Sequence, residues 1–429
     1  MSRLRITGQT PLRGTLIPSG NKNAALPMLA ACLLTDQTIT LRNVPMIEDV
    51  RVMLDLLASL GVDVSPLADH SVTLRAKSLS TRELTPELCR RVRGSILFAG
   101  PLAARLGEVI LPPPGGDVIG RRRVDTHFAG LQQLGIHIQA SDHYHLRRKS
   151  LRGADILLDE ASVTATENVM MAAALADGTT RIDNAACEPH VQDLGRMLAE
   201  MGARIEGLGT NRLIITGVDA LHGCEYEIQP DHIEIGSFAA VAAVTGGEIR
   251  IPCGTTMTTH LGMTERVFKR LGVNWLWEGT DLVVDGHTAL QIESDLGAAI
   301  PKVEDGPWPA FPSDLMSVAL VVATQAHGTI LFFEKMFESR MFFVDQLISM
   351  GARIVQCDPH RVLISGPAPL HGFRMATPDI RAGMALVIAA LSAKGESVIE
   401  NADIIDRGYE SIEERLLALG ANVKRENHS

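Results

Sequence analysis

The sequence predicts an α/β protein with mixed sheets, in which one structural unit of roughly 70 residues occurs six times. Three observations lead to this fold class. Six helix-like runs end in Leu-Gly or Met-Gly, a β-rich run follows each glycine, and a further strand signal precedes five of the six runs. The glycines that mark the six units are Gly61, Gly135, Gly202, Gly272, Gly351 and Gly420.

The helix-like runs are amphipathic, as in residues 50–61 and 411–420, where apolar residues recur every three or four positions. A glycine directly after such a run is a usual helix stop, and the β-branched residues that follow favour a strand. The strand signals upstream each open with a turn, at residues 37–44, 178–185, 247–253, 328–334 and 395–402. Each unit therefore reads as a strand, a helix, and then one or two strands.

The chain has 429 residues, which is too long for one ordinary core, so we expect two domains of three units each. Neither a GxGxxG nor a GxxxxGKS motif occurs, so nucleotide-binding folds of those kinds are not indicated. Only 4% of residues are aromatic and the net charge is −10, which argues against a nucleic-acid partner. An anionic substrate would need a local cluster of positive charge.

The N-terminus has no apolar core of signal-peptide length, and the longest apolar stretches, residues 24–34 and 384–391, are too short to span a membrane. We therefore expect a cytoplasmic protein with no membrane partner. The six cysteines are scattered and form no CxxC pair. They are expected to be reduced, mostly buried thiols, and a structural zinc site is not expected.

Lys22 is the first candidate functional residue. It stands in a turn rich in glycine and asparagine that leads directly into an apolar helix. A lysine at a helix N-terminus, beside free backbone N–H groups, suits an anion. The alternative is an ordinary surface lysine.

The segment 111–127 is the second candidate. It combines three prolines, three glycines and the consecutive Arg121, Arg122 and Arg123, with Asp117 close by. Guanidinium groups bind phosphate and carboxylate through two N–H groups at once, and loops of this composition often carry function. The alternative is a solvated basic loop.

The third candidate is a set of polar residues in the second half of the chain. An arginine between apolar stretches is expensive to bury without an anion. The alternative for each is a structural salt bridge, for example with Asp379 or Asp406. From the residues alone, the sequence indicates an enzyme for small phosphorylated substrates. The residues in question are Asp314, Arg340, Arg381 and Arg407.

Seven sequence motifs resemble those of the UDP-N-acetylglucosamine 1-carboxyvinyltransferases and occur in the same order. The similarity extends from Leu4 to about Arg425. The resemblance implies an inside-out α/β barrel with two domains of three repeats: residues 22–230, with the flexible loop 111–123, and residues 1–21 plus 231–429. It places the active site in the cleft between them. The motifs are GNKNAALP, RGSILFAGPLAARLG, PPGGDVIGRRRVDTHFAGLQQLG, DHIEIGSF, AFPSDL, FESRMF and IDRGYESIEERLLALGA.

The reaction that the resemblance implies transfers the enolpyruvyl group of phosphoenolpyruvate to the 3-hydroxyl of UDP-N-acetylglucosamine and releases phosphate. It is the first committed step of peptidoglycan synthesis. The reaction passes through a tetrahedral ketal by addition and elimination, and it needs no metal and no cofactor. It does need a base for the hydroxyl, an acid for the methylene carbon, and cations for phosphate and carboxylate.

Carried over by position, Asp314 is the base, and Asp117 stands where the family usually has a cysteine that serves as the general acid. Arg93 supports the loop, and Arg381 helps to lock the closed state. The remaining residues are expected to bind substrate. Lys22, Arg122, Arg407 and the nearby Arg340 are assigned to phosphoenolpyruvate, with Lys22 and Arg407 also counted as catalytic, and Asn23, Asp125, His127, Ser162 and Val163 are assigned to the nucleotide sugar. The family also leads us to expect a monomer.

Asp117 poses a chemical problem. A free carboxyl group titrates near ~3.9 and a thiol near ~8.5, so the two groups start on opposite sides of neutral pH. Neighbouring arginines favour the carboxylate, which is the wrong form for an acid. We therefore hypothesise that Asp117 is protonated only in the closed ternary complex. A carboxylate is also a far poorer nucleophile than a thiolate, so epoxide drugs that alkylate the loop thiol should fail here.

The sequence departs from the family mainly on the nucleotide side. Three alternatives therefore stay open: a divergent paralogue with a different acceptor, a non-catalytic paralogue that binds nucleotide sugar and regulates a true transferase, and, more weakly, the shikimate-pathway enolpyruvyl transferase. Glu160 would repel a diphosphate unless Arg121 or Arg123 compensates. The departures are Arg123 for a proline, Thr126 for a leucine, Glu160 for a lysine, Thr164 for a glycine and His232 for an arginine.

Overall fold

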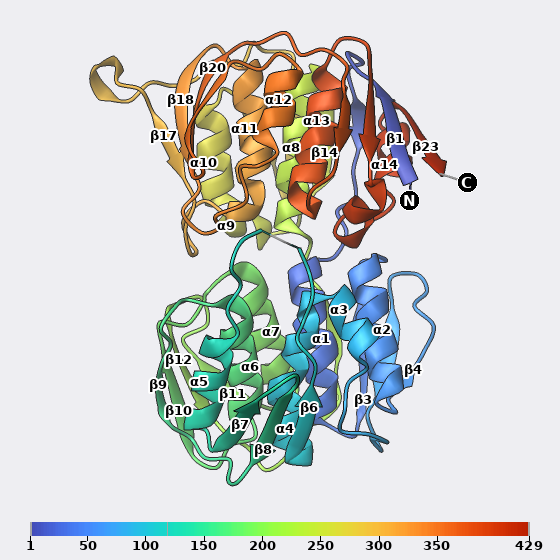
Figure 1. The fold of residues 1–429 in the computed structure, drawn as a ribbon, viewed down its shortest axis with the longest axis vertical. Coiled ribbons are helices and arrows are strands. Elements are labelled where there is room, and N and C mark those ends of the chain that lie inside the picture. The colour runs from blue at the N-terminus through green and yellow to red at the C-terminus, as the bar shows by residue number, and fades with distance from the viewer. Residues whose placement is uncertain (1, 118, 428–429) are drawn as a thin grey trace. The chain divides into compact units, whose positions relative to one another are not determined.

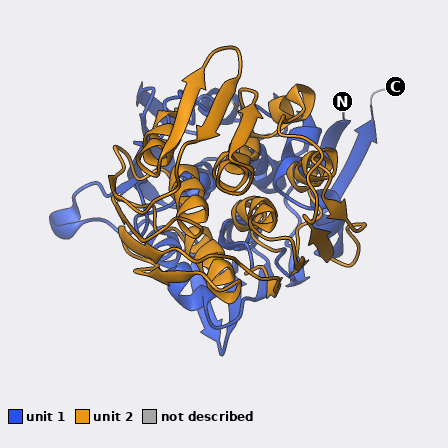
Figure 2. Ribbon diagram, turned by 90° about the horizontal axis from the view of Figure 1, so that it is seen from below, with its two compact units in different colours: residues 1–19, 118–121, 230–429 blue, residues 20–117, 122–229 orange. Residues whose placement is uncertain are grey.

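The computed structural model describes residues 2–117 and 119–427 and divides the chain into two compact units. Unit 1 comprises residues 1–19, 118–121 and 230–429, and unit 2 comprises residues 20–117 and 122–229 (Figure 2). Each unit has its own hydrophobic core. The N-terminal strand β1 (Ser2–Thr7) belongs to unit 1 because it pairs antiparallel with β22 (Glu396–Glu400) and β23 (Asn422–Asn427).

The described residues form six sheets, three in each unit, as the sequence predicts. In five of them a central strand has one parallel and one antiparallel neighbour. These central strands lie within the five strand signals found in the sequence. They are β3 (Thr38–Arg42), β10 (Thr179–Asp183), β14 (Glu248–Pro252), β18 (Gly328–Phe333) and β22.

The sixth sheet is built differently. It has the order β6-β8-β7, with β6 (Glu108–Leu111), β7 (Ile136–Ala140) and β8 (Tyr144–Arg148), and both of its pairings are antiparallel. Its repeat is the one without an upstream strand signal. The other strands are β2 (Arg13–Thr15), β4 (Asp63–Val64), β5 (Val72–Arg75), β9 (Asp155–Leu157), β11 (Arg204–Glu206), β12 (Arg212–Thr216), β13 (Glu225–Glu227), β15 (Asn274–Glu278), β16 (Asp281–Asp285), β17 (Lys302–Glu304), β19 (Ile354–Asp358), β20 (Arg361–Gly366) and β21 (Arg374–Ala376).

The centre of each unit is occupied by helices that are apolar on all sides. In unit 1, α8 (His232–Thr245), α11 (Met316–Gln325) and α13 (Ile380–Ser392) pack against one another, and the sheets surround them (Figure 1). Nearly every residue of these three helices is buried, which explains why they read as continuous runs of Ala, Val, Leu and Ile. This arrangement of inner helices and outer sheets is the predicted inside-out α/β barrel.

The amphipathic helices before the six marker glycines are confirmed as well. Each ends two residues before its glycine, and each glycine has a φ between +86° and +105°, a region that side chains with a Cβ adopt only with strain. These helices are α2 (Glu48–Ser59), α5 (Asp125–Gln133), α7 (Pro189–Glu200), α10 (Gly262–Arg270), α12 (Val344–Ser349) and α14 (Ile412–Ala418).

The remaining helices are short or carry candidate site residues. They are α1 (Lys22–Ala31), α3 (Pro86–Arg91), α4 (Ala99–Leu106), α6 (Val163–Ala173), α9 (Met257–His260) and the 3-10 helices η1 (Cys32–Leu34), η2 (Arg93–Phe98), η3 (Leu296–Ala298), η4 (Ser313–Leu315) and η5 (Ala402–Arg407). No helix among the described residues is long and apolar enough to cross a membrane.

Candidate active site

In unit 1, two buried arginines converge on Asp314. Arg340 Nη2 donates to Asp314 Oδ1 at 2.6 Å, while Arg381 donates to Asp314 Oδ2 from Nε at 2.9 Å and from Nη2 at 2.7 Å. Both arginine side chains are less than one-tenth exposed, and Asp314 is 23% exposed. The carboxylate is therefore held by guanidinium groups on both oxygens while it stays accessible to solvent.

Local structure fixes the two arginines in place. Arg381 lies in the first turn of α13, where the helix cap Asp379 accepts from the backbone N–H of Arg381, and its guanidinium lies 5.6 Å from the ring centre of Tyr409. Arg340 lies 5.2 Å from the ring centre of Phe337. Burial is the largest single effect on the pKa of Arg381 and lowers it, but the charges of Asp314, Tyr409 and Asp231 together outweigh burial, and the pKa is raised overall.

The expected alternative, a salt bridge of each arginine with a sequence neighbour, is wrong for Arg381. The side chain of Arg381 bonds to Asp314, 67 residues away, and to Tyr409, and Asp379 instead lies 3.6 Å from Arg340 Nη1. Asp406 pairs with Arg425 at 2.7 Å. Arg340 Nε and Arg381 Nη1 are buried and have no hydrogen-bond partner among the described residues. Buried donors of this kind are rare in proteins and suit an anionic ligand or water.

His232 and Arg407 lie in the same unit. His232 is the first residue of α8 and is buried. Burial lowers the pKa of His232, the charges of Asp231 and Asp314 raise it by a smaller amount, and the charge of Arg381 lowers it. This histidine, which departs from the family pattern, therefore lies near the Asp314 cluster. Arg407 is half-buried at the end of η5, which packs against α13.

A buried pair of carboxyl groups, which has no signal in the sequence, lies next to the Asp314 segment. Glu334 and Asp305 are fully buried. Ser313, next to Asp314, donates to Glu334 at 3.0 Å, and Glu334 also accepts from the backbone N–H of Phe337 at 3.1 Å. Burial, followed by the hydrogen bond and the charge of Asp305, raises the pKa of Glu334 to about 9. With a pKa this high, Glu334 is protonated at neutral pH.

In unit 2, Lys22 begins α1 and is buried, so the alternative of a surface lysine is wrong. Its Nζ lies 2.8 Å from Oδ2 of Asp49, which is also buried. The side chain of Asn21 caps the helix by accepting from the backbone N–H of Ala24 at 3.0 Å. Asn23, the next residue of the helix, is half-buried.

The loop 111–123 is held at its C-terminal end by Arg93. The Nη2 atom of Arg93 donates to the carbonyl oxygens of Arg122 at 2.9 Å and Arg123 at 3.2 Å. Burial and the charge of Arg122 lower the pKa of Arg93 to about 10. A Cβ on Gly116 would lie 2.7 Å from Arg93 Cβ, so the chain approaches Arg93 too closely for a larger residue. Asp117 follows and is half-buried.

Residues 119–121, which belong to unit 1, form hydrogen bonds with other residues of that unit. Ser339 donates its backbone N–H to the carbonyl oxygen of Ile119 at 3.2 Å, and the Arg121 N–H donates to Glu338 Oε2 at 3.2 Å. Both partners lie directly before Arg340. The side chain of Arg121 is exposed and has no ion pair among the described residues.

Two of the residues that depart from the family pattern are joined by Asp159. Arg123 Nη2 donates to Asp159 at 2.9 Å, and the Thr126 hydroxyl donates to the same carboxylate at 2.6 Å. Arg123 Nε also donates to Asp125 at 3.1 Å. The charge of Arg123 is therefore already balanced by two carboxylates, so Arg123 is not a free cation that could compensate Glu160.

Thr164 lies in the first turn of α6, directly after Ser162 and Val163. The Ser162 side chain caps the helix by accepting from the Ala165 N–H at 3.4 Å. The hydroxyl of Thr164 lies 3.0 Å from Nε2 of His127, which is buried.

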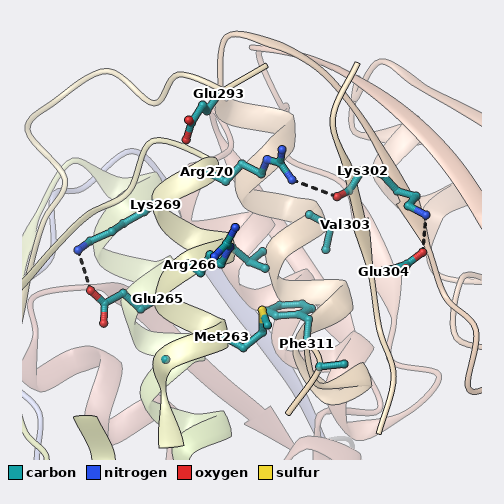
Figure 3. A pocket seen from close by; sticks show the side chains of 13 residues that line it. Met263, Glu265, Arg266, Lys269, Arg270, Glu293, Lys302, Val303, Glu304 and Phe311 are labelled. Carbon is teal, nitrogen blue, oxygen red and sulfur yellow. Dashed lines mark hydrogen bonds and ion pairs between the residues drawn. The ribbon is translucent and has the colours of Figure 1, made fainter. Parts of the chain in front are cut away.

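One cavity of about 740 Å³ lies in unit 1 between α10 and β17 (Figure 3). None of the predicted site residues is among the residues that line it. Its cations are mostly paired with neighbours, for example Lys269 with Glu265 at 2.7 Å. All six cysteines are free, but only Cys32, Cys89 and Cys253 are buried, so the expectation of mostly buried thiols is wrong for the other half.

Unit 1 thus brings Asp314, Arg340 and Arg381 into direct contact, and unit 2 brings Arg93 to the backbone of Arg122. Several partners have no signal in the sequence, because a polar side chain that pairs across a long sequence separation has no local pattern. The partners that were missed are Asp49, Asp159, Asn168, Asp305 and Glu334.

Comparisons with known proteins define the class. Residues 6–416 match the family EPSP synthase (3-phosphoshikimate 1-carboxyvinyltransferase). The fold is similar to that of the enolpyruvyl transferase NikO from Streptomyces tendae, with a TM-score of 0.89, 23% identity and coverage of 100% of this chain and 99% of that one. It is also similar to EPSP synthase from Acinetobacter baumannii, with a TM-score of 0.78, 17% identity and full coverage of both chains. The chain is a transferase with the enolpyruvyl transferase fold.

Sequence relatives narrow the class. A UDP-N-acetylglucosamine 1-carboxyvinyltransferase from Bradyrhizobium diazoefficiens is 56% identical over 98% of this chain and 97% of its own length. A protein of the same name from Treponema denticola is 52% identical over 98% of both chains, and one from Treponema pallidum is 51% identical over 99% of this chain and 100% of its own. The chain belongs to the UDP-N-acetylglucosamine 1-carboxyvinyltransferases.

Proposed function

We propose that the protein transfers the enolpyruvyl group of phosphoenolpyruvate to the 3-hydroxyl of UDP-N-acetylglucosamine and releases phosphate, as in the first committed step of peptidoglycan synthesis. The observation that carries this proposal is the identity of 51% to 56% over almost the whole chain with transferases named for this reaction. Neither a different acceptor nor a silent regulatory role has comparable support. Lys22, Asp314 and Arg407, which a silent copy would be expected to lose, are all present.

In the proposed reaction Asp314 accepts the proton of the sugar hydroxyl as its oxygen bonds to the central carbon of phosphoenolpyruvate. Asp117 protonates the methylene carbon, which gives the tetrahedral ketal. Elimination then breaks the bond to phosphate, and the new methyl group loses a proton to restore the double bond. A base and an acid placed in this way each contribute about 10²- to 10⁴-fold to the rate.

The cations proposed to hold phosphoenolpyruvate are Lys22, Arg122, Arg340 and Arg407. The buried donors of Arg340 and Arg381 without a protein acceptor support an anion beside Asp314. Asp49 partly neutralises Lys22, and this pairing lowers the energetic cost of burying the ammonium group before the substrate binds. The proposal requires residues of both units, because Lys22 and Arg122 belong to unit 2 and the others to unit 1.

The nucleotide sugar is assigned to Asn23, Asp125, Ser162 and Val163 directly, and to His127 through Thr164, because the His127 ring is buried and its Nε2 lies 3.0 Å from the Thr164 hydroxyl. The side chain of Asp125 is 63% exposed although Arg123 pairs with it, so it remains accessible to a ligand. The bonds of Arg123 and Thr126 to Asp159 support a loop that keeps its shape without the usual proline.

Release of phosphate from phosphoenolpyruvate, measured with and without UDP-N-acetylglucosamine, tests the proposal. We expect release that depends on both substrates. Release with a different acceptor and none with UDP-N-acetylglucosamine would favour the divergent paralogue. Binding of UDP-N-acetylglucosamine without any release would favour the silent regulator.

We also propose that the enzyme acts as a monomer in the cytoplasm, as the family resemblance implies. Light scattering on the purified protein should then give a mass near 46.3 kDa. A mass of twice this value would contradict the monomer, and recovery in the membrane fraction of cells would contradict the location.

A further inference from the structure

The ring of His127 lies between Asn168 and Thr164 in the interior of unit 2. Its Nδ1 is 3.0 Å from Asn168 Nδ2, and its Nε2 is 3.0 Å from the hydroxyl of Thr164. Asn168 is fully buried and His127 is 1% exposed. The protonation of the ring therefore follows from its two neighbours.

Asn168 can adopt only one amide orientation. The backbone N–H of Gly100 can only donate, and it lies 2.8 Å from Asn168 Oδ1. The carbonyl oxygen of Ile96 can only accept, and it lies 2.9 Å from Asn168 Nδ2. The amide thus presents an N–H to His127, and Nδ1 of the ring must accept it.

A histidine that accepts at Nδ1 is neutral and carries its hydrogen on Nε2. This agrees with the pKa of His127, which burial and then the charge of Arg93 lower to about 3. The Nε2–H donates to Thr164, so the hydroxyl oxygen of Thr164 is an acceptor in this bond.

The single hydrogen of the Thr164 hydroxyl must therefore point away from His127. Among the described residues His127 is the only hydrogen-bond partner of this hydroxyl. Thr164 is half-buried in the first turn of α6, beside Ser162 and Val163. The hydroxyl is thus a donor of fixed polarity next to residues assigned to the nucleotide sugar.

We propose that Thr164 is a specificity-determining residue whose hydroxyl donates to an anionic diphosphate oxygen of the nucleotide sugar, with its direction set by His127 and Asn168. This inference rests on the proposed function. The position is a glycine in the family pattern, so the donor is an addition in this chain. It supplies a hydrogen bond to a charged oxygen on the side where Glu160 replaces a lysine.

Binding of UDP-N-acetylglucosamine to the full-length enzyme, measured by calorimetry without phosphoenolpyruvate, tests the proposal. Thr164→Val keeps the shape of the side chain but removes the donor, and we expect the Kd to rise about tenfold. Thr164→Ser restores the donor and should stay within about threefold of wild type. Thr179→Val, at an exposed position of β10 in the same unit, is the matched control and should not change the Kd.

Steady-state kinetics should show the same selectivity, with a raised KM for UDP-N-acetylglucosamine and an unchanged KM for phosphoenolpyruvate. A Kd of Thr164→Val within twofold of wild type would overturn the inference, and so would an equal loss in Thr164→Ser. A wild-type enzyme that does not bind UDP-N-acetylglucosamine would overturn the proposed function as well.

Nitrogen NMR of the histidine rings in the free enzyme gives an independent readout. We expect the His127 resonances of the neutral Nε2–H form at pH 7. A proton on Nδ1, or a charged ring, would overturn the inference even if Thr164→Val binds weakly.

Discussion

Two N–H groups of Arg381, on Nε and Nη2, donate to the same oxygen of Asp314 at 2.9 and 2.7 Å. Arg340 occupies the other oxygen at 2.6 Å. These bonds occupy both oxygens of the carboxylate, and two neighbouring guanidinium groups favour its ionised form, which is the form that the proposed base needs. We expect some of these arginine bonds to move to the substrate anion when phosphoenolpyruvate binds.

Asp314→Asn should lower kcat by at least 100-fold, because an amide cannot take the proton of the sugar hydroxyl. Steady-state phosphate release measures this change. Asp142→Asn, at an exposed turn, is the matched control and should leave kcat unchanged. Since removal of Asp314 leaves two buried arginines without their partner, thermal unfolding must be measured alongside. A folded Asp314→Asn enzyme with near-normal kcat would exclude Asp314 as the base.

Asp117→Asn should lower kcat by about 10²- to 10⁴-fold, because an amide cannot protonate the methylene carbon. The binding of UDP-N-acetylglucosamine alone should stay as in wild type, since the hypothesis gives Asp117 its proton only in the closed ternary complex. The test is kcat together with calorimetric binding. If kcat stays near the wild-type value, Asp117 is not the acid.

Fosfomycin should not inactivate the wild-type enzyme covalently, because the carboxylate of Asp117 is a far poorer nucleophile than a thiolate. Asp117→Cys should become sensitive, with time-dependent loss of activity and a mass increase on the loop peptide. Cys357, which is exposed, controls for non-specific alkylation when it is changed to serine in the same background. Wild-type inactivation that maps to Asp117 would refute the prediction.

Much of the fold could be predicted from the sequence, because each repeat is specified by residues that are close together in the chain. A glycine such as Gly61 must follow its helix in a left-handed conformation, and a strand such as β14 needs β-branched residues. The sheet of β6, β7 and β8 was not anticipated in this form. The four-residue strand β6 follows directly on the left-handed Gly107 that ends α4, without the turn and strand signal seen elsewhere.

The candidate site was only partly predictable. Motifs located Asp314, Arg340 and Arg381, but the bond between Asp314 and Arg381 spans 67 residues and left no local trace. The same holds for Lys22 and Asp49. Burial decides whether such a charge is a surface group or part of a site, and a single charged residue in the sequence does not reveal its burial.

The pair Glu334 and Asp305 leads to a prediction about pH. The folded pKa of Glu334, about 9, lies above that of an unfolded glutamate, about 4.3, because the group is buried next to another carboxyl group. The protonated form therefore stabilises the fold fully below pH ~4.3, and this contribution is lost as the pH rises towards about 9. Arg340 and the Ser313 hydroxyl, which face Glu334, oppose the shift.

Glu334→Gln cannot ionise, so its stability relative to wild type should improve by at least ~1 kcal/mol between pH 5 and pH 8. Urea unfolding at the two pH values measures the difference. Glu414→Gln, an exposed carboxylate on α14, should show no such trend. An equal pH dependence in wild type and Glu334→Gln would mean that Glu334 is not protonated at neutral pH. The bonds from Ser313 and Phe337 to Glu334 would then hold the Asp314 segment through an ionised carboxylate.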